Sequence, residues 1–417
     1  MINKFLFFGL IVLLVEYYSF VAVRSVIKQT PDSIHGYLFL LYIILSLVTL
    51  CGFFALSHYG RGVWPSVTLK YAVNMLVGVF IGKFLVATIL LFTDVALLIP
   101  NLISFANSFK SHPIGSPPEG SRFMSRFTFI SQLALGVGAL VTLGLGYGIR
   151  NRYRYQLKKV KLSLKNLPSE FKGLRIIQIS DIHSGSLDDP EAVSKGVDLI
   201  MREKPDLILF TGDLVNNQAE EVNPYLKIFG QLKAPMGVYS VLGNHDYGDY
   251  VSWPSEVAKR ENLDALKQHH ADLGWRLLLN EHVLLELNSQ QIALIGIENW
   301  GARGFAKYGD MKKAVAGLEH VNVPIKILLS HDPSHWEAEV RKEYRDIDLT
   351  LSGHTHGMQF GIDIPGFKWS PVQYVYKQWA GLYQEDNQSL YVNRGYGFIG
   401  YQGRVGILPE ITLIELS

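Results

Sequence analysis

The chain has 417 residues and a net charge of +2, with 48% hydrophobic and 18% charged residues. Residues 1–149 hold only 13 of the Asp, Glu, Lys and Arg residues, whereas residues 150–417 hold 63. This division excludes one uniform soluble protein, and the lack of a strongly basic part excludes a nucleic-acid-binding domain. The single cysteine, Cys51, excludes an intrachain disulfide and a cysteine-based metal site.

Four long apolar runs occupy the first third of the chain. About 20 apolar residues span the hydrocarbon core of a bilayer as a helix, and each run reaches that length. Four such runs disfavour the alternative of buried core helices in a soluble domain. The sequence therefore predicts an all-α transmembrane region over residues 1–149, with helices near 5–23, 36–56, 71–100 and 127–148.

Three ionisable residues, Glu16, Lys83 and Asp94, fall inside these runs. A charge within a membrane is costly and points to a functional role by default. Lys83 and Asp94 share a helix face but lie three turns apart, too far to pair directly. We expect Glu16 to face a neighbouring helix, Lys83 to extend its ammonium group toward the membrane surface, and Asp94 to lie near the interface.

A basic segment, 150–173, follows the last apolar run and is interpreted as a linker. From residue 174 onward, short runs of β-branched and other apolar residues alternate with helical stretches. Such alternation favours a layered α/β domain over residues 174–417. The predicted strands include 174–180, 206–211, 237–242, 291–296, 325–329, 348–351, 391–392 and 411–416.

Polar clusters follow five of these predicted strands, at the edge where ligands bind in open α/β sheets. Residues two apart in an extended segment project to the same side, so the Asp/His and His/His pairs can each converge on one centre. The clusters supply Asp, Asn and His but no sulfur, a ligand set that divalent Mn, Fe or Zn accepts. In chain order they are Asp181-Ile-His183, Gly212-Asp213, Gly243-Asn244-His245-Asp246, Ser330-His331 and Gly353-His354-Thr355-His356.

Taken singly, each cluster has an ordinary alternative. Asp181 or Asp213 alone is more often a helix N-cap than a metal ligand, and His331 alone is more often a core histidine. Those alternatives would have to hold at five strand ends at once, which favours a site.

The ordered set resembles the calcineurin-like metallophosphoesterase family, whose pattern D-x-H, GD, GNH[DE], H, GHxH is complete here. Within that family the chain is similar to the membrane-tethered bacterial branch of the YkuE and YaeI types. The resemblance implies an α/β fold in which two mixed β-sheets, flanked by helices, form a four-layer sandwich. It also implies two divalent metal ions, with the choice among Mn, Fe and Zn left open.

The resemblance also assigns roles by position. Asp213 would bridge the two ions, His245 would stabilise the phosphate oxygens or protonate the leaving group, and Asp246 would orient His245. Arg394 and Arg404 could bind a distal phosphate of the substrate through bidentate contacts, with a surface salt bridge or loop contact as the alternative. The remaining assigned ligands are Asp181, His183 and His356 for one ion, and Asn244, His331 and His354 for the other.

The expected function is that of a membrane-anchored hydrolase of a phosphodiester or a pyrophosphate. Some members of the wider family cleave UDP-2,3-diacylglucosamine in lipid A biosynthesis, so a lipid-linked substrate follows by analogy. One alternative is a non-catalytic membrane sensor or scaffold built on a metal-bound phosphoesterase fold. Another is a transporter formed by residues 1–149. The lipid bilayer is an expected partner, nucleic acid is not, and the oligomeric state is left open.

Four spans place both ends of the chain on one side of the membrane. Nine Lys and Arg residues flank the spans on that side and five on the other. The positive-inside rule therefore favours a bacterial inner (plasma) membrane protein whose C-terminal domain is cytoplasmic. An outward-facing domain stays open, because Ser125-Arg126-Phe127 resembles a decayed twin-arginine export signal ahead of the fourth span.

Overall fold

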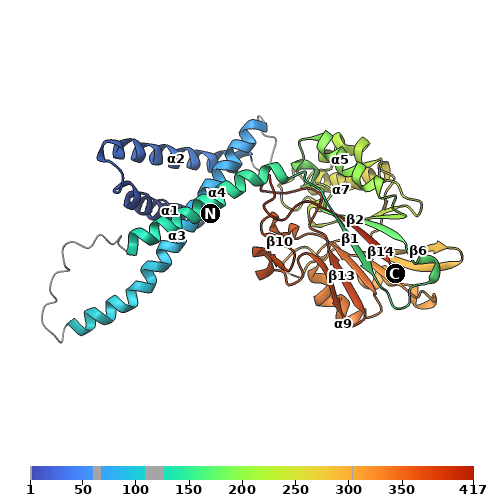
Figure 1. The fold of residues 1–417 in the computed structure, drawn as a ribbon. Coiled ribbons are helices and arrows are strands. Elements are labelled where there is room, and N and C mark those ends of the chain that lie inside the picture. The colour runs from blue at the N-terminus through green and yellow to red at the C-terminus, as the bar shows by residue number, and fades with distance from the viewer. Residues whose placement is uncertain (1, 60–66, 109–125, 303) are drawn as a thin grey trace. The chain divides into compact units, whose positions relative to one another are not determined.

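The computed structural model describes residues 2–59, 67–108, 126–302 and 304–417 (Figure 1). They divide into two compact units, Met1–Tyr147 and Gly148–Ser417, called here the helical unit and the C-terminal unit. Some residues used above for the charge count and the export-signal motif lie outside the described residues, namely Arg61, Lys110, Arg122 and Ser125.

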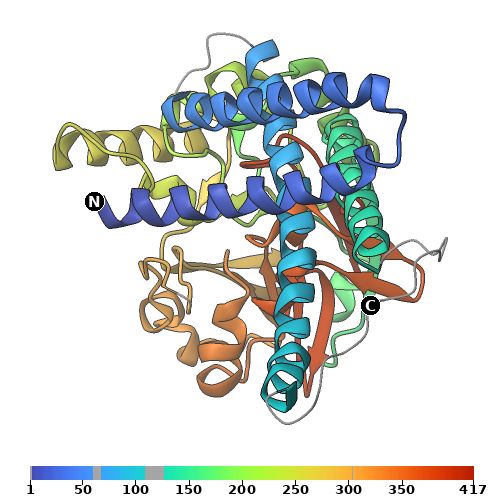
Figure 2. The ribbon, with the colours of Figure 1, turned by 90° about the vertical axis from the view of Figure 1, so that its left-hand side faces the viewer.

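The described part of the helical unit contains four helices that are long and apolar enough to cross a membrane, as predicted. Each begins before its predicted apolar run, because a helix satisfies its own backbone hydrogen bonds and continues into polar flanks. Helices α1 and α2 both pack against α3 and cross it (Figure 2). The helices are α1 (Ile2–Ile27), α2 (Asp32–Tyr59), α3 (Val67–Ser108) and α4 (Arg126–Gly148).

Small residues allow α3 and α4 to approach each other closely. A Cβ atom added to Gly82 would lie 2.7 Å from the carbonyl oxygen of Gly138, and one added to Gly138 would lie 2.8 Å from that of Gly82. The hydroxyl of Thr142 donates to the Gly138 carbonyl at 2.9 Å within α4. Gly78 and Gly82 form a G-x-x-x-G pattern, which is typical of membrane helices that pack backbone against backbone.

A polar cluster joins α1, α2 and α3. The Lys83 ammonium donates to the Glu16 carboxylate at 2.9 Å and to the Ser46 hydroxyl at 2.6 Å. The Tyr42 hydroxyl donates to the same carboxylate at 3.0 Å. Glu16 therefore faces neighbouring helices, as expected. The prediction that Lys83 reaches toward the membrane surface is wrong, because Glu16 provides a counterion between the helices and Lys83 is 8% exposed.

Two six-stranded mixed sheets form the centre of the C-terminal unit. The first has the strand order β1 (Gln156–Leu162), β14 (Glu410–Leu416), β2 (Arg175–Ile179), β3 (Leu207–Phe210), β4 (Val238–Ser240), β5 (Arg276–Leu277). The second has the order β12 (Gly381–Glu385), β13 (Gln388–Val392), β9 (Leu349–Ser352), β8 (Lys326–Leu329), β7 (Gln290–Gly296), β6 (Glu281–Leu287).

The predicted four-layer sandwich is confirmed by how the core is divided. One apolar cluster lies between the sheets and contains Leu209 of the first and Leu351 of the second. A second cluster joins the outer face of the first sheet to α5 (Pro190–Arg202) and α7 (Glu256–Asp272). A third joins the second sheet to α8 (Met311–Val315) and a π-helical turn, Trp336–Val340. The short elements that complete the unit include α6 (Leu226–Phe229), α9 (Arg341–Glu343), β10 (Ile362–Ile364) and β11 (Phe367–Trp369).

The segment 150–173 is not a linker, contrary to the prediction. It contributes β1, which pairs in parallel with β14 at the far end of the chain. Three of the eight Lys and Arg residues of this segment stand on the edge strand β1, where charged side chains protect a sheet from unwanted pairing. They pair with acidic residues, Lys158 with Asp363, Lys159 with Glu203 and Lys161 with Glu415.

Candidate metal centre

The seven predicted metal ligands lie in loops that directly follow five strands. Asp181 follows β2, Asp213 follows β3 and Asn244 follows β4 in the first sheet. His331 follows β8 and His354 follows β9 in the second sheet. The two sheets face each other, so these loops meet at one edge of the sandwich.

The first group of ligands brings together Asp181, His183 and His356. The Nε2 atoms of the two histidines are 3.0 Å apart, and His356 Nε2 is 3.2 Å from Asp181 Oδ1. All three side chains are buried.

The second group brings together Asp213, His331 and His354. His331 Nε2 lies 3.1 Å from Asp213 Oδ2 and 3.3 Å from His354 Nδ1. The Asn244 carbonyl oxygen lies 2.8 Å from the same His354 nitrogen. Asp213 Oδ2 is also 3.5 Å from His183 Nε2 in the first group, so Asp213 stands between the two groups.

The residues present fit divalent cations. Ligands about 2.1 Å from a metal ion have neighbouring donor atoms about 3 Å apart, which matches the separations above. Two histidines have one ring nitrogen fixed by a hydrogen bond and the other turned to the centre, as ligating histidines do. His331 Nδ1 donates to the Thr211 carbonyl at 2.7 Å, and His354 Nε2 bonds to the Tyr376 hydroxyl at 2.9 Å.

Four of the ligands also have protonation states that suit metal binding, whereas His331 does not: burial opposes its ionisation, but the adjacent Asp213 carboxylate raises its pKa to about 10. Burial alone would raise the pKa of Asp181, but the adjacent His356 lowers it below its usual range. Burial likewise opposes ionisation of Asp213, yet His331 holds its pKa well below normal. Burial lowers the pKa values of His183 and His356, which favours neutral imidazoles. Ionised carboxylates and neutral imidazoles are the forms that bind cations.

The backbone is strained where the ligands stand. Five of the seven have a positive φ, between 49° and 70°, which is rare for residues other than glycine. Strain of this kind persists where the surroundings fix it, and it clusters at functional sites. Close approach of the loops also requires glycine, since a Cβ on Gly243 would lie 2.7 Å from the Asp213 nitrogen. The five ligands are Asp181, His183, Asp213, His354 and His356.

His245 lies at the centre, whereas Asp246 has other partners than the sequence suggested. His245 lines the hollow at the centre, and its Nδ1 donates to the Asn216 carbonyl at 2.8 Å. Asp246 does not orient His245. Its buried carboxylate instead accepts from the backbone N–H groups of Asp213 at 2.9 Å and Leu214 at 2.8 Å. Burial, with Asp213 nearby, raises the pKa of Asp246 to about 7.

Comparisons with known proteins agree with this geometry. Residues 174–358 match the family described as calcineurin-like phosphoesterase. Residues 3–152 match the transmembrane domain described for probable calcineurin-like phosphoesterases. The metallophosphoesterase YkuE of Bacillus subtilis is 30% identical over 305 residues, which cover 70% of this chain and 98% of YkuE.

The chain belongs to the calcineurin-like metallophosphoesterase family.

Two other relatives match a smaller part of this chain. A zebrafish (Danio rerio) protein described as a transmembrane protein with metallophosphoesterase domain is 31% identical over 265 residues, 62% of this chain. The match spans only 56% of the fish protein. The UDP-2,3-diacylglucosamine pyrophosphatase LpxG of Chlamydia trachomatis is 31% identical over 300 residues, covering 60% of this chain and 86% of LpxG. Calcineurin-like phosphoesterases use divalent metals, and the two ligand groups are where this chain could bind them.

Two arginines of this metallophosphoesterase are placed differently from the expectation that they contact substrate. Arg394 is 5% exposed and pairs with Glu410 and, at 3.1 Å, with Asp363. Arg404 is fully buried and donates to backbone carbonyls, among them that of Arg394 at 2.8 Å. The Arg404 guanidinium supports the C-terminal loops from within by bonding to their carbonyls, whereas Arg394 is held by two carboxylates.

The sequence did not indicate three residues that hold a ligand or His245 in place. Tyr376 bonds to His354, and it lies among several aromatic residues of 367–383, whose residue types do not single it out. The Tyr250 hydroxyl accepts from the Asn244 amide nitrogen at 2.8 Å, which turns the carbonyl oxygen of that amide to the centre. Asn216 acts through its backbone, for which residue type gives no signal.

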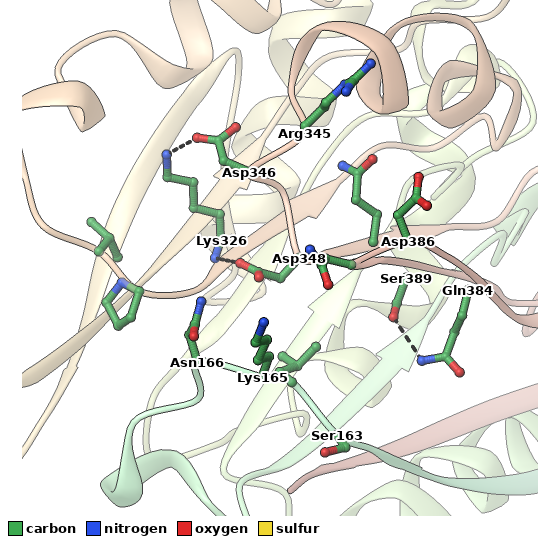
Figure 3. A pocket seen from close by; sticks show the side chains of 15 residues that line it. Ser163, Lys165, Asn166, Lys326, Arg345, Asp346, Asp348, Gln384, Asp386 and Ser389 are labelled. Carbon is green, nitrogen blue, oxygen red and sulfur yellow. Dashed lines mark hydrogen bonds and ion pairs between the residues drawn. The ribbon is translucent and has the colours of Figure 1, made fainter.

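The hollow at the metal centre has a volume of about 200 Å³, and Tyr250, Phe305 and Ile399 add apolar surface to its lining. A second hollow lies at the opposite ends of β8 and β9, and Figure 3 shows its lining. Lys326, Asp346 and Asp348 line it, and there Lys326 pairs with Asp346 through its side chain and with Asp348 through its backbone N–H. No predicted site residue lines this hollow.

Proposed function

We propose that the protein is a membrane-anchored, binuclear metal-dependent hydrolase of a phosphodiester or a pyrophosphate. The observation that carries this proposal is the position of Asp213 between two groups of ligands, with donor atoms 3.5 Å and 3.1 Å away on the two sides. Such an arrangement suits a pair of cations that share one carboxylate.

Two bound cations would supply a hydroxide at neutral pH, by lowering the pKa of a bound water, and would offset the charge of the phosphate. The chain's own residues would do the rest. His245 is held at Nδ1 by the Asn216 carbonyl, so its Nε2 faces the hollow and, in the imidazolium form, would give its proton to the leaving oxygen and keep the hydrogen on Nδ1. The Tyr250 ring packs on His245, with ring centroids 4.6 Å apart, and restricts its rotation.

We further propose a lipid-linked substrate. Tethering an enzyme to a bilayer raises the effective concentration of a substrate that is held in the same bilayer. The apolar side chains of Phe305 and Ile399 beside the hollow suit a substrate with an apolar portion. LpxG supports UDP-2,3-diacylglucosamine as the first compound to examine.

The test is hydrolysis of bis(p-nitrophenyl) phosphate by the detergent-purified full chain, with and without Mn²⁺. Asn244→Ala and His245→Ala are the test variants, and His320→Ala is the matched control because His320 is an exposed histidine away from the hollow. We expect metal-dependent turnover that both test variants lose and the control keeps. Metal content by elemental analysis separates the outcomes. Bound metal without turnover on this ester or on UDP-2,3-diacylglucosamine would favour the sensor or scaffold, and no bound metal would refute the proposal.

We also propose that the membrane is the bacterial inner (plasma) membrane and that the C-terminal unit is cytoplasmic. The excess of Lys and Arg on the side of that unit supports this orientation. Labelling of Val257→Cys in a Cys51→Ser background tests it, since Val257 is exposed on α7. A membrane-impermeant maleimide should label this position only after the cells are opened. Labelling in intact cells would place the unit outside.

A further inference from the structure

The C-terminal unit exposes most of its large apolar side chains in one short segment. Among its described residues, eleven large hydrophobic side chains are exposed, and six of these lie between residues 358 and 375. An exposed apolar surface of this kind marks a site of contact with another protein or a membrane. We call it the apolar patch, and its members are Met358, Ile362, Ile364, Phe367, Tyr374 and Val375.

The β10–β11 hairpin at the centre of the patch exposes its apolar face, which is the reverse of a hairpin in a soluble protein. Ile362 pairs with Trp369 and Ile364 with Phe367, and side chains alternate along a strand, so these four share one face. Ile364 and Phe367 are 57% and 53% exposed. A hairpin at a protein surface normally buries its apolar face and exposes its polar one.

The polar face of the hairpin is bonded to the body of the C-terminal unit. Asp363 pairs with Arg394 at 3.1 Å and with Lys158 at 3.3 Å. On the opposite strand, Lys368 donates to the carbonyl oxygen of Ala380 at 2.6 Å. These contacts hold the hairpin in an orientation that leaves its apolar face outward. The exposure of Ile364 and Phe367 is therefore built into the fold.

The hairpin is also tied to the chain that leaves the fourth membrane span. That candidate span ends at Asn151. Within the C-terminal unit, the Arg404 N–H donates to the Gly148 carbonyl at 2.9 Å, and the Asn151 amide donates to the Arg404 carbonyl at 3.3 Å. The next residue, Val405, accepts from the Gly361 N–H at 2.9 Å, and Gly361 directly precedes β10. Gly361, at the start of the hairpin, therefore bonds to the residue next to Arg404, and Arg404 bonds to the last residues of the candidate span.

We propose that the apolar patch docks on the surface of the lipid bilayer in which the helical unit is anchored. The tie between the hairpin and the end of the last span favours the bilayer over a protein partner, because it keeps the patch close to lipid. Apolar side chains that enter the headgroup and acyl boundary are stabilised there, and Tyr and Trp are enriched at that depth. The docking does not depend on the proposed reaction.

The test places a nitroxide spin label at Ile364→Cys in the full-length Cys51→Ser protein, in vesicles of phosphatidylcholine and phosphatidylglycerol. Collision of the label with oxygen reports lipid, and collision with a water-soluble nickel chelate reports solvent. Val257→Cys is the matched control, since Val257 is 53% exposed on α7 of the same unit. Leu140→Cys, 72% exposed in the fourth span, gives the lipid reference. We expect the oxygen-to-nickel ratio at position 364 to exceed that at position 257 several-fold.

Two results would overturn the proposal. One is a ratio at position 364 equal to that at position 257. The other is protection from both reagents together with spin–spin broadening, which would mean that a second copy of the chain covers the patch. Circular dichroism checks that the labelled chain is folded, and Phe367→Cys repeats the measurement on the paired strand if the first label perturbs it.

Discussion

The hydroxyl of Tyr376 lies 2.9 Å from Nε2 of His354, on the side of the ring opposite the metal centre. A hydrogen on Nε2 leaves Nδ1 as the lone-pair nitrogen, and Nδ1 is the atom that faces His331 and Asn244. The Tyr376 hydroxyl donates its own hydrogen to Asp332 Oδ2 at 3.3 Å, so it accepts from His354 and selects the tautomer in which His354 can bind a cation.

Removal of that hydroxyl should weaken metal binding. In Tyr376→Phe the ring stays but His354 loses its fixed tautomer, and loss of such a partner typically costs about 10- to 100-fold in metal affinity. The measurement is activity as a function of free Mn²⁺, where we expect a shift of the midpoint and recovery at high Mn²⁺. Tyr374→Phe is the control, because Tyr374 is 77% exposed and two residues away. An unchanged midpoint in Tyr376→Phe would contradict this role.

Substitution of Asp246 should lower the free energy of unfolding and disturb the position of Asp213. Its carboxylate accepts from four backbone N–H groups, three of them in Asp213–Val215 and the fourth at Gly243. In Asp246→Asn, an amide NH₂ would replace one acceptor oxygen and face N–H donors, at a cost of about 1–3 kcal/mol for a buried unsatisfied group. Hydrogen exchange at residues 213–215 should accelerate and metal affinity should fall. Asp272→Asn, at an exposed helix end, is the control, and unchanged exchange in Asp246→Asn would count against this account.

The ligand loops were predictable because each motif has a local physical signature, a buried strand followed at once by Asp, Asn or His. The role of Asp246 was not, since its partners are backbone groups that carry no residue-specific signal. Strand β1 was missed because its partner, β14, lies some 250 residues further on, and parallel pairing at that distance leaves no local pattern. The pairing of Lys83 with Glu16 was missed because two helices had to be placed before either charge had a neighbour.

That Lys83–Glu16 pair leads to a prediction for the helical unit. Lys83→Met alone leaves the partly buried Glu16 carboxylate between the helices without its cation, and removal of one partner of a fully buried pair costs about 3–5 kcal/mol, which is an upper bound here. Replacement of both, in Lys83→Met with Glu16→Leu, should cost much less because no charge stays unpaired. Unfolding of the full chain by sodium dodecyl sulfate in mixed micelles measures both. Equal destabilisation by the single and double variants would mean that the pair is not coupled.

The free energy of unfolding of the C-terminal unit should fall at acidic pH, and His270 should cause part of that fall. This side chain is fully buried on α7 beside Ser240, with its Nδ1 2.9 Å from the Ser240 hydroxyl, and burial lowers its pKa from 6.5 to about 3. A histidine with a lower pKa in the folded state than in the unfolded state stabilises the fold at pH values above its unfolded-state pKa. That contribution is lost as the pH falls from about 6.5 toward 3. At pH 5 the loss from this one group is about 2 kcal/mol.

His270→Gln should therefore make the stability of the C-terminal unit less dependent on pH between 6.5 and 5. Glutamine can keep a hydrogen bond to Ser240 but does not titrate, so it removes the proton uptake that accompanies unfolding. His269→Gln is the matched control, since His269 is the neighbouring histidine and faces Asp272 at the end of the helix. Hydrogen exchange of β3 and β4 in the full chain at pH 7 and pH 5, corrected for intrinsic rates, gives the two slopes. Identical slopes in His270→Gln and the unaltered chain would show that another group governs acid sensitivity.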